Sequence, residues 1–153
     1  MQTLGNIDLL EHGNKIGFLA SRKYTAAAVL NSFDWALAQK KLGKCIVSGF
    51  HSPLEQNIIK FFLNGDYPVI VVLSRSLYAN IPELWQPAID KGNMLIISPF
   101  EQPPIRPTEI TADIRNRWIL ENTPAVAIGW ASQNGKLREL IAHYEEKTSI
   151  VYL

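Results

Sequence analysis

The chain has 153 residues, of which 47% are apolar and 19% charged, and this length fits one domain with a core of its own. The formal net charge of +1 excludes the general positive field that drives non-specific binding of nucleic acids. The single cysteine, Cys45, excludes an intrachain disulfide, no apolar run approaches the roughly 18 residues of a membrane span, and the cytoplasm is the expected compartment.

Short apolar runs alternate with segments of helical periodicity from the first strand onward. Lys15–Ala20 is the first expected strand, and residues 25–42 follow as a helix. The stripe of this helix that we expect to face the core consists of Ala26, Leu30, Phe33 and Leu37, with Val29 and Ala36 beside it. Ser52, Pro53 and Glu55 form a capping-box pattern that begins the next helix, which ends near Leu63.

The later segments continue the alternation. Further strands are expected at residues 44–48, 68–73, 94–98, 124–129 and 149–153, and further helices at 82–91, 108–121 and 132–147. We therefore predict an α/β fold, a three-layer Rossmann-like sandwich with a mainly parallel sheet of about six strands. It forms one domain over residues 1–153, with its core at 15–153 and an N-terminal extension at 1–14.

Ligands of such sheets bind beyond the carboxyl ends of the strands, at the point where the strand order reverses. We expect that reversal between the strands at Lys15–Ala20 and Met94–Ser98. The first loop at this edge carries Ser21, Arg22 and Lys23 in front of a helix N-terminus. Such a combination attracts phosphate, although a solvated loop would have the same composition.

The loop after the second strand carries Ser48, Gly49 and His51. Gly49 would let a ligand approach the backbone closely, whereas a lone loop histidine such as His51 is more often simply exposed. Arg75 is the cation of the loop after the third strand, and Ser132 follows the fifth strand as either a helix cap or a ligand contact.

Arg115, Asn116 and Arg117 lie in the helix before the fifth strand. In a helix, Arg115 shares a face with Trp118 while Arg117 points elsewhere. A solvated face is the usual meaning of such charges, but the position near the ligand edge favours a functional role.

Catalytic and metal-binding motifs do not stand out in this sequence. We find no GxGxxG, HExxH, CxxC, GxSxG or Walker pattern, and the three histidines show no ligand spacing. The sequence therefore predicts no catalytic residues, metal or cofactor, and favours a binding module over an enzyme.

Taken in order, several segments resemble the DprA/Smf family of DNA-processing proteins over about residues 15–141. Ala20-Ser21-Arg22 is similar to the family's G-S-R motif, Val47-Ser48-Gly49 to its V-S-G motif, Ser98-Pro99-Phe100 to its S-E-Y-P turn and Arg115-Asn116-Arg117 to its R-N-R motif. The resemblance implies a Rossmann-like domain that binds single-stranded DNA and forms a homodimer. The phosphate contacts that it implies are Ser21, Arg22, Ser48, Gly49, Arg115 and Arg117.

The expected function is a stand-alone, divergent, non-catalytic module that recognises phosphate and binds single-stranded DNA or a nucleotide-derived ligand. One alternative is a hydrolase of a nucleotide or phosphoribose compound, with Glu55 or Glu101 as the acid or base. The other is a ligand-sensing protein with a degenerate pocket. The low charge and four tryptophans suit a homodimer face.

Overall fold

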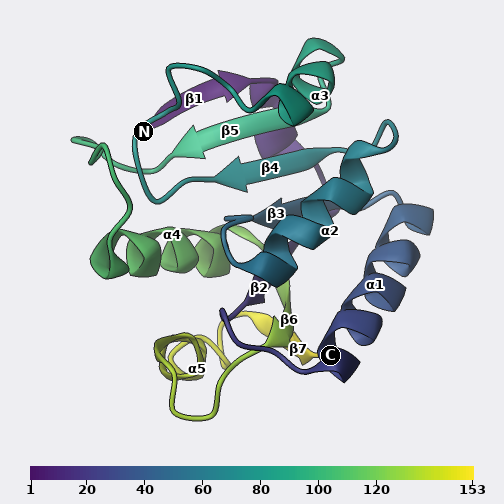
Figure 1. Ribbon diagram of the computed structural model, residues 1–153, viewed down its shortest axis with the longest axis vertical. Helices are drawn as coiled ribbons and strands as arrows, with labels where there is room; N and C mark the ends of the chain where they lie inside the picture. Colours follow the sequence, from purple (N-terminus) through teal and green to yellow (C-terminus); the bar gives the residue numbers. More distant parts are fainter.

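The computed structural model describes residues 1–153 and contains one seven-stranded sheet with helices on both faces (Figure 1). The strands are β1 (Gln2–Gly5), β2 (Lys15–Ala20), β3 (Cys45–Ser48), β4 (Val69–Val72), β5 (Met94–Ser98), β6 (Ala125–Trp130) and β7 (Ser149–Tyr152). The helices are α1 (Ala26–Lys41), α2 (Pro53–Leu63), α3 (Gln86–Asp90), α4 (Glu109–Asn122) and α5 (Lys136–Ala142), with short 3-10 segments η1 (Ile7–Glu11) and η2 (Glu83–Trp85). The predicted α/β sandwich is confirmed.

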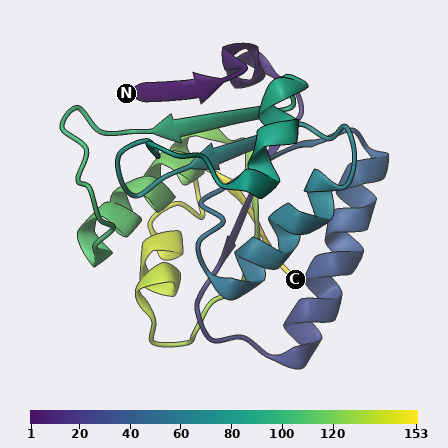
Figure 2. The ribbon, with the colours of Figure 1, turned by 45° about the horizontal axis from the view of Figure 1, so that its top comes forward.

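The strands lie in the order β1-β5-β4-β3-β2-β6-β7. Every neighbouring pair is parallel except β1 and β5. The four residues of β4 are all buried, which is typical of a parallel strand covered on both faces. One core cluster packs under α1, α2 and α3, and a second packs under α4, α5 and η1, so that the sheet is the middle of three layers (Figure 2).

The expected N-terminal extension contains a seventh strand. β1 pairs antiparallel with β5, and Leu9 of η1 is buried in the core. Gly5 has a φ of +103°, and a Cβ atom there would lie 2.3 Å from the Met94 carbonyl oxygen. The strand escapes sequence-based prediction because its side chains are mostly exposed and form no apolar run.

The strand order reverses between β2 and β6. The chain runs outward through β3, β4 and β5 and then crosses to the other side of β2. The expected reversal between β2 and β5 is therefore wrong. The reason is that α4 returns the chain across the opposite face of the sheet, a connection that no local pattern encodes.

The predicted core stripe of α1 is only partly confirmed: Ala36 is buried, and Val29 and Phe33 pack against the core, but the two leucines do not. Leu30 is 69% exposed and Leu37 is 46% exposed. The buried side chains of this helix are Ala28, Ser32, Ala36 and Gln39. Small residues on this face let the helix approach the sheet closely, since a Cβ atom at Gly129 of β6 would lie 2.9 Å from the Ser32 hydroxyl oxygen.

Local signals at the helix ends are borne out. Thr25 caps α1, and Ser52 and Glu55 form the capping box of α2. The helix expected at 132–147 is shorter, because α5 begins only after Gly135.

Cys45 is buried, and burial raises the pKa of its thiol to about 12. None of the helices combines the length and apolar character that a membrane-spanning segment requires.

Candidate phosphate-binding site

A cavity of about 700 Å³, which we call the switch-point cavity, opens beyond the carboxyl ends of the central strands. It is bounded by the loop after β2, the start of α2 and the first half of α4. Five of the residues predicted from the sequence line it: Ser21, Arg22, His51, Arg115 and Asn116. The structure thus brings together three loops that are remote in the chain, as expected at a reversal of strand order.

Arg115 is the buried cation of this cavity. Its side chain projects from α4, and the residue is only 5% exposed. The Nε–H donates to Asn116 Oδ1 over 3.0 Å, and none of the ion pairs in the protein includes Arg115. Burial lowers the pKa of Arg115, and the nearby charge of Glu55 opposes that shift. The terminal amino groups therefore remain available to an anion.

Gly49 makes room for this guanidinium group. A Cβ atom at position 49 would lie 2.6 Å from both Cδ and Nη1 of Arg115, closer than atoms can pack. Gly49 of the Val47-Ser48-Gly49 motif thus leaves the space that the side chain of Arg115 occupies. The two residues are 66 positions apart in the chain. Ser48 plays a different part, since its buried hydroxyl oxygen accepts a hydrogen bond from the Phe50 N–H.

Glu55 holds two of the loops in place. One carboxylate oxygen accepts from the Ala20 N–H over 2.9 Å, and the other accepts from the N–H groups of His51 and Ser52. The residue is 3% exposed. Because its oxygens are occupied by backbone donors, Glu55 acts as a support that joins the end of β2 to the start of α2.

The loop between Ser48 and Ser52 has an unusual backbone. Phe50 has a φ of +47°, a region that non-glycine residues rarely adopt, while its ring is buried. The adjacent His51 lines the cavity. Burial lowers the pKa of His51 and the positive charge of Arg115 lowers it further, against an opposing effect of Glu55, so that the neutral imidazole is favoured.

A second, smaller cavity of about 260 Å³ adjoins the first, and we call it the aromatic cavity. It shares Arg115 and His51 with the switch-point cavity. Tyr78 and Trp85 line it, with their ring centroids 6.0 Å apart. The guanidinium of Arg75 lies 4.6 Å from the centre of the Tyr78 ring.

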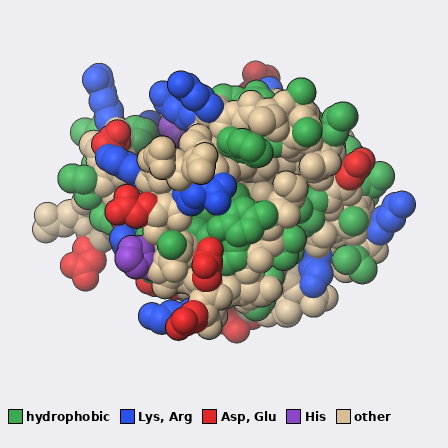
Figure 3. All heavy atoms as spheres, turned by 90° about the horizontal axis from the view of Figure 1, so that it is seen from below, with side chains coloured by type: hydrophobic (Ala, Val, Ile, Leu, Met, Phe, Trp, Pro, Cys, Tyr) green, Lys and Arg blue, Asp and Glu red, His purple; other side chains and the backbone are tan.

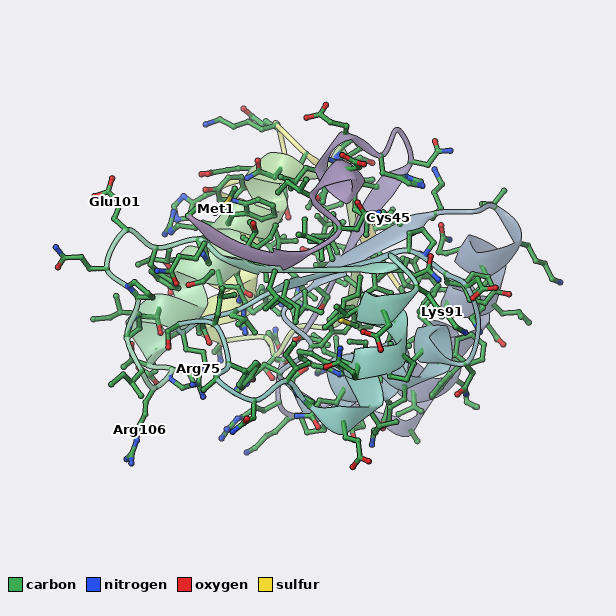
Figure 4. All side chains as sticks on the ribbon, turned by 90° about the horizontal axis from the view of Figure 1, so that it is seen from above. Met1, Cys45, Arg75, Lys91, Glu101 and Arg106 are labelled. Carbon is green, nitrogen blue, oxygen red and sulfur yellow. The ribbon has the colours of Figure 1, made fainter.

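Of these three residues, the sequence singles out only Arg75. Tyr78 and Trp85 lie in the irregular segment between β4 and α3, where no periodic pattern indicates which side chains line a cavity. Arg75 lies at the same end of the molecule as Glu101 and Arg106, and Lys91 lies at the other end (Figure 4). Glu101 and Arg106 point outward from their loop.

Other predicted residues lie at the rim or elsewhere. Ser132 contacts Ser21, whose hydroxyl oxygen accepts from the Ser132 N–H over 3.3 Å. Lys23 is exposed, and its carbonyl accepts from the Ser21 hydroxyl. Arg117 lines a different groove, between α4 and α5, and pairs with Asp113 over 2.7 Å.

Charge around the candidate site is local. On the face shown in Figure 3, basic and acidic side chains are interspersed, and no continuous basic field covers it. Binding of an anion would thus depend on the few cations that line the cavities. No group of three or more His, Cys, Asp or Glu side chains is placed to hold a metal ion.

Two solved structures are similar to almost the whole chain. DNA processing protein A (DprA) from Streptococcus pneumoniae has a TM-score of 0.77 and 21% identity, over 98% of this chain and 53% of that one. DprA from Helicobacter pylori, which has a unique single-stranded DNA binding mode, has a TM-score of 0.72 and 19% identity, over 97% of this chain and 69% of that one. The chain has a DprA-like fold.

The DprA-like fold confirms at the level of architecture the resemblance that the sequence motifs indicate. The chain spans about half the length of the S. pneumoniae DprA that it matches. No protein-family model matches the sequence, and neither does any curated protein. Motif residues Arg22, Gly49 and Arg115 meet around the two cavities, whereas Arg117 of the R-N-R motif does not.

Proposed function

We propose that the chain is a non-catalytic module that binds single-stranded DNA, or a nucleotide-derived ligand, through phosphate groups held in the switch-point cavity. The observation that carries this proposal is Arg115, a cation that is nine-tenths buried and has no carboxylate partner. Buried charges in proteins are normally paired, because desolvation of an unpaired one is costly. A phosphate would provide the missing acceptor in a charge-assisted hydrogen bond.

The neighbouring residues are suited to the same ligand. Arg22 and Ser21 line the same cavity, where they would contact a second oxygen or the next phosphate. Tyr78 and Trp85 offer ring faces in the adjoining aromatic cavity, and bases of single strands stack on such rings without sequence preference. The binding mode of the H. pylori DprA supports single-stranded DNA as the first ligand to test.

The hydrolase alternative has less support. Glu55 would have to act as the acid or base, but both of its oxygens accept backbone hydrogen bonds. Glu101 lies on an exposed loop and points away from the body of the molecule (Figure 4). Glu55 lines the cavity, but its occupied oxygens are not free for general acid-base chemistry, and Glu101 does not line it.

The test is the binding of a short labelled oligo-dT strand, measured by fluorescence anisotropy over a series of salt concentrations. We expect binding that weakens with salt, because phosphate contacts release counter-ions. Combining Arg22→Ala with Arg115→Ala should reduce the slope of log affinity against log salt by about two.

Lys44→Ala combined with Lys91→Ala removes the same charge just before the amino ends of β3 and β5, away from both cavities, and serves as the matched control. Equal binding by the two double variants would contradict the proposal. If DNA does not bind, a thermal-shift series of nucleotides distinguishes a ligand-binding cavity from a degenerate one, since binding stabilises the folded state.

A further inference from the structure

A groove of about 630 Å³ continues the aromatic cavity along α2. It lies between the end of α2 and the segment of η2 and α3, and we call it the α2 groove. Lys60, Leu63 and Leu84 line both the aromatic cavity and the α2 groove. Arg115 and His51 are shared in the same way by the aromatic and switch-point cavities. The two cavities and the groove therefore form one continuous track.

One face of α2 forms a wall of this track. Gln56, Lys60 and Leu63 follow one another at intervals of four and three residues, so they lie on the same side of the helix. The Gln56 side-chain amide donates to the His51 carbonyl oxygen over 2.8 Å, which joins this face to the candidate phosphate site. Since α2 begins after the carboxyl end of β3 and runs back along the sheet (Figure 1), the track leads away from the switch-point cavity.

Lys60 is the cation in the middle of the track. Its side chain is exposed, and it takes part in none of the ion pairs or cation–π contacts of the protein. Lys40, by contrast, has its ammonium 3.8 Å from the centre of the Phe61 ring. Unpaired lysines are common on protein surfaces, so it is the place of Lys60 between the aromatic cavity and the α2 groove that points to a ligand.

Leu84 is an exposed apolar side chain at the same junction. It is 65% exposed, although it lies next to the ring of Trp85 in the sequence and lines the cavity with it. Along the track, apolar side chains thus alternate with cations, as bases alternate with phosphates in a single strand. A mononucleotide held at Arg115 would leave Lys60 and Leu84 without a contact.

We propose that the track binds a continuous single strand of about four nucleotides, with one phosphate at Arg115, a base against Tyr78 and Trp85, and a further phosphate at Lys60. This inference rests on the proposed function, and it selects a strand over a mononucleotide as the ligand of that site.

The length of the strand follows from the helix. Lys60 lies seven residues after Pro53, the first residue of α2, which corresponds to about 10 Å along the helix axis. A stacked strand advances about 3.4 Å per phosphate, so the distance from the start of α2 to Lys60 equals about three phosphate spacings.

The far end of the α2 groove is acidic. Glu83 lines the groove but neither of the two cavities. A carboxylate repels phosphate, so we expect the strand to leave the track between Lys60 and Glu83. Glu83→Gln should therefore strengthen the binding of strands longer than the track, and it should not affect a dinucleotide.

Fluorescence anisotropy with 5′-phosphorylated, labelled oligo-dT strands of two, four and six nucleotides measures the length of the site. We expect the affinity of the wild type to increase about tenfold from two to four nucleotides and less than about threefold from four to six. Lys60→Ala should weaken binding of the four-nucleotide strand about fivefold and reduce its salt slope by about 0.7, because one phosphate contact is lost. Leu84→Glu, which places a carboxylate beside Lys60, should weaken it further.

Lys41→Ala is the matched control. It removes the same charge from an exposed position of α1 that lines none of the three parts of the track, so it should leave binding unchanged at every length. Equal affinity of the wild type for two and four nucleotides, or a Lys60→Ala variant that behaves like Lys41→Ala, would overturn the track and leave the site at Arg115 in place. Failure of the proposed function is distinguishable, because the Arg22→Ala/Arg115→Ala variant would then bind the dinucleotide like the wild type. Absence of binding at every length would overturn both.

Discussion

Two arginines on opposite faces of α4 lie in contrasting environments. Arg115 faces the cavities, is 5% exposed, and has a pKa lowered by burial. Arg117, two residues later, faces solvent, and its hydrogen bond with Asp113 raises its pKa. A rotation of about 200° along the helix separates them. Residue type therefore does not distinguish the two arginines, whereas burial without a carboxylate partner does.

The largest change in DNA affinity is expected for Arg115→Met, with Arg117→Met as its matched control. We expect Arg115→Met to weaken oligo-dT binding about 30-fold, or about 2 kcal/mol, because a charged hydrogen bond to phosphate is lost. Arg117→Met should change the affinity less than twofold. Anisotropy at fixed salt measures both.

Thermal unfolding of the same two variants separates binding from structure. Burial of an unpaired charge is costly, and an apolar side chain of similar length removes that cost, so the Tm of Arg115→Met should equal or exceed that of the wild type. A marked decrease in Tm, with unchanged DNA affinity, would show that Arg115 is a structural residue and that the two faces differ only in burial.

Gly49→Ala is expected to have an intermediate effect. The added methyl group would lie 2.6 Å from Cδ and Nη1 of Arg115 and must displace the guanidinium from the cavity wall. We expect about tenfold weaker binding, together with a lower Tm from overpacking. Gly13→Ala is the control, because a Cβ atom there meets nothing within 4 Å. Wild-type affinity in Gly49→Ala would show that the position of Arg115 does not depend on this contact.

The smallest expected effect concerns pH. Burial and the charge of Arg115 lower the pKa of His51, which favours the neutral imidazole in the free protein. A phosphate bound beside it would favour the protonated form and raise that pKa. Binding then takes up a proton, and affinity should increase severalfold as the pH falls from about 7 to about 5.

His51→Gln should abolish this dependence on pH while leaving the salt dependence in place. Titrations of both proteins against oligo-dT at several pH values measure the effect. An identical pH profile in the variant would place the responsible proton on another group and remove His51 from the site.

Part of the candidate site could be predicted from local sequence. Arg22, Gly49 and Arg115 stand in short motifs, and each motif follows a strand or begins near the ligand edge. Tyr78 and Trp85 could not be found in this way, because nothing in their immediate sequence indicates that they line a cavity with Arg115. Tyr78 and Trp85 precede β5 and Arg115 follows it, so only the tertiary fold brings them to one cavity.

The sequence by itself determined the alternation of strands and helices, the buried character of β4 and the caps at Thr25 and Ser52. Each of these depends on residues within one or two turns of each other. Only the tertiary structure decided that β6 lies beside β2, that β1 joins the sheet, and that Arg115 turns inward while Arg117 does not. The outward direction of Leu30 and Leu37 was likewise decided by packing, because α1 is apolar on two sides and the sheet can cover only one of them.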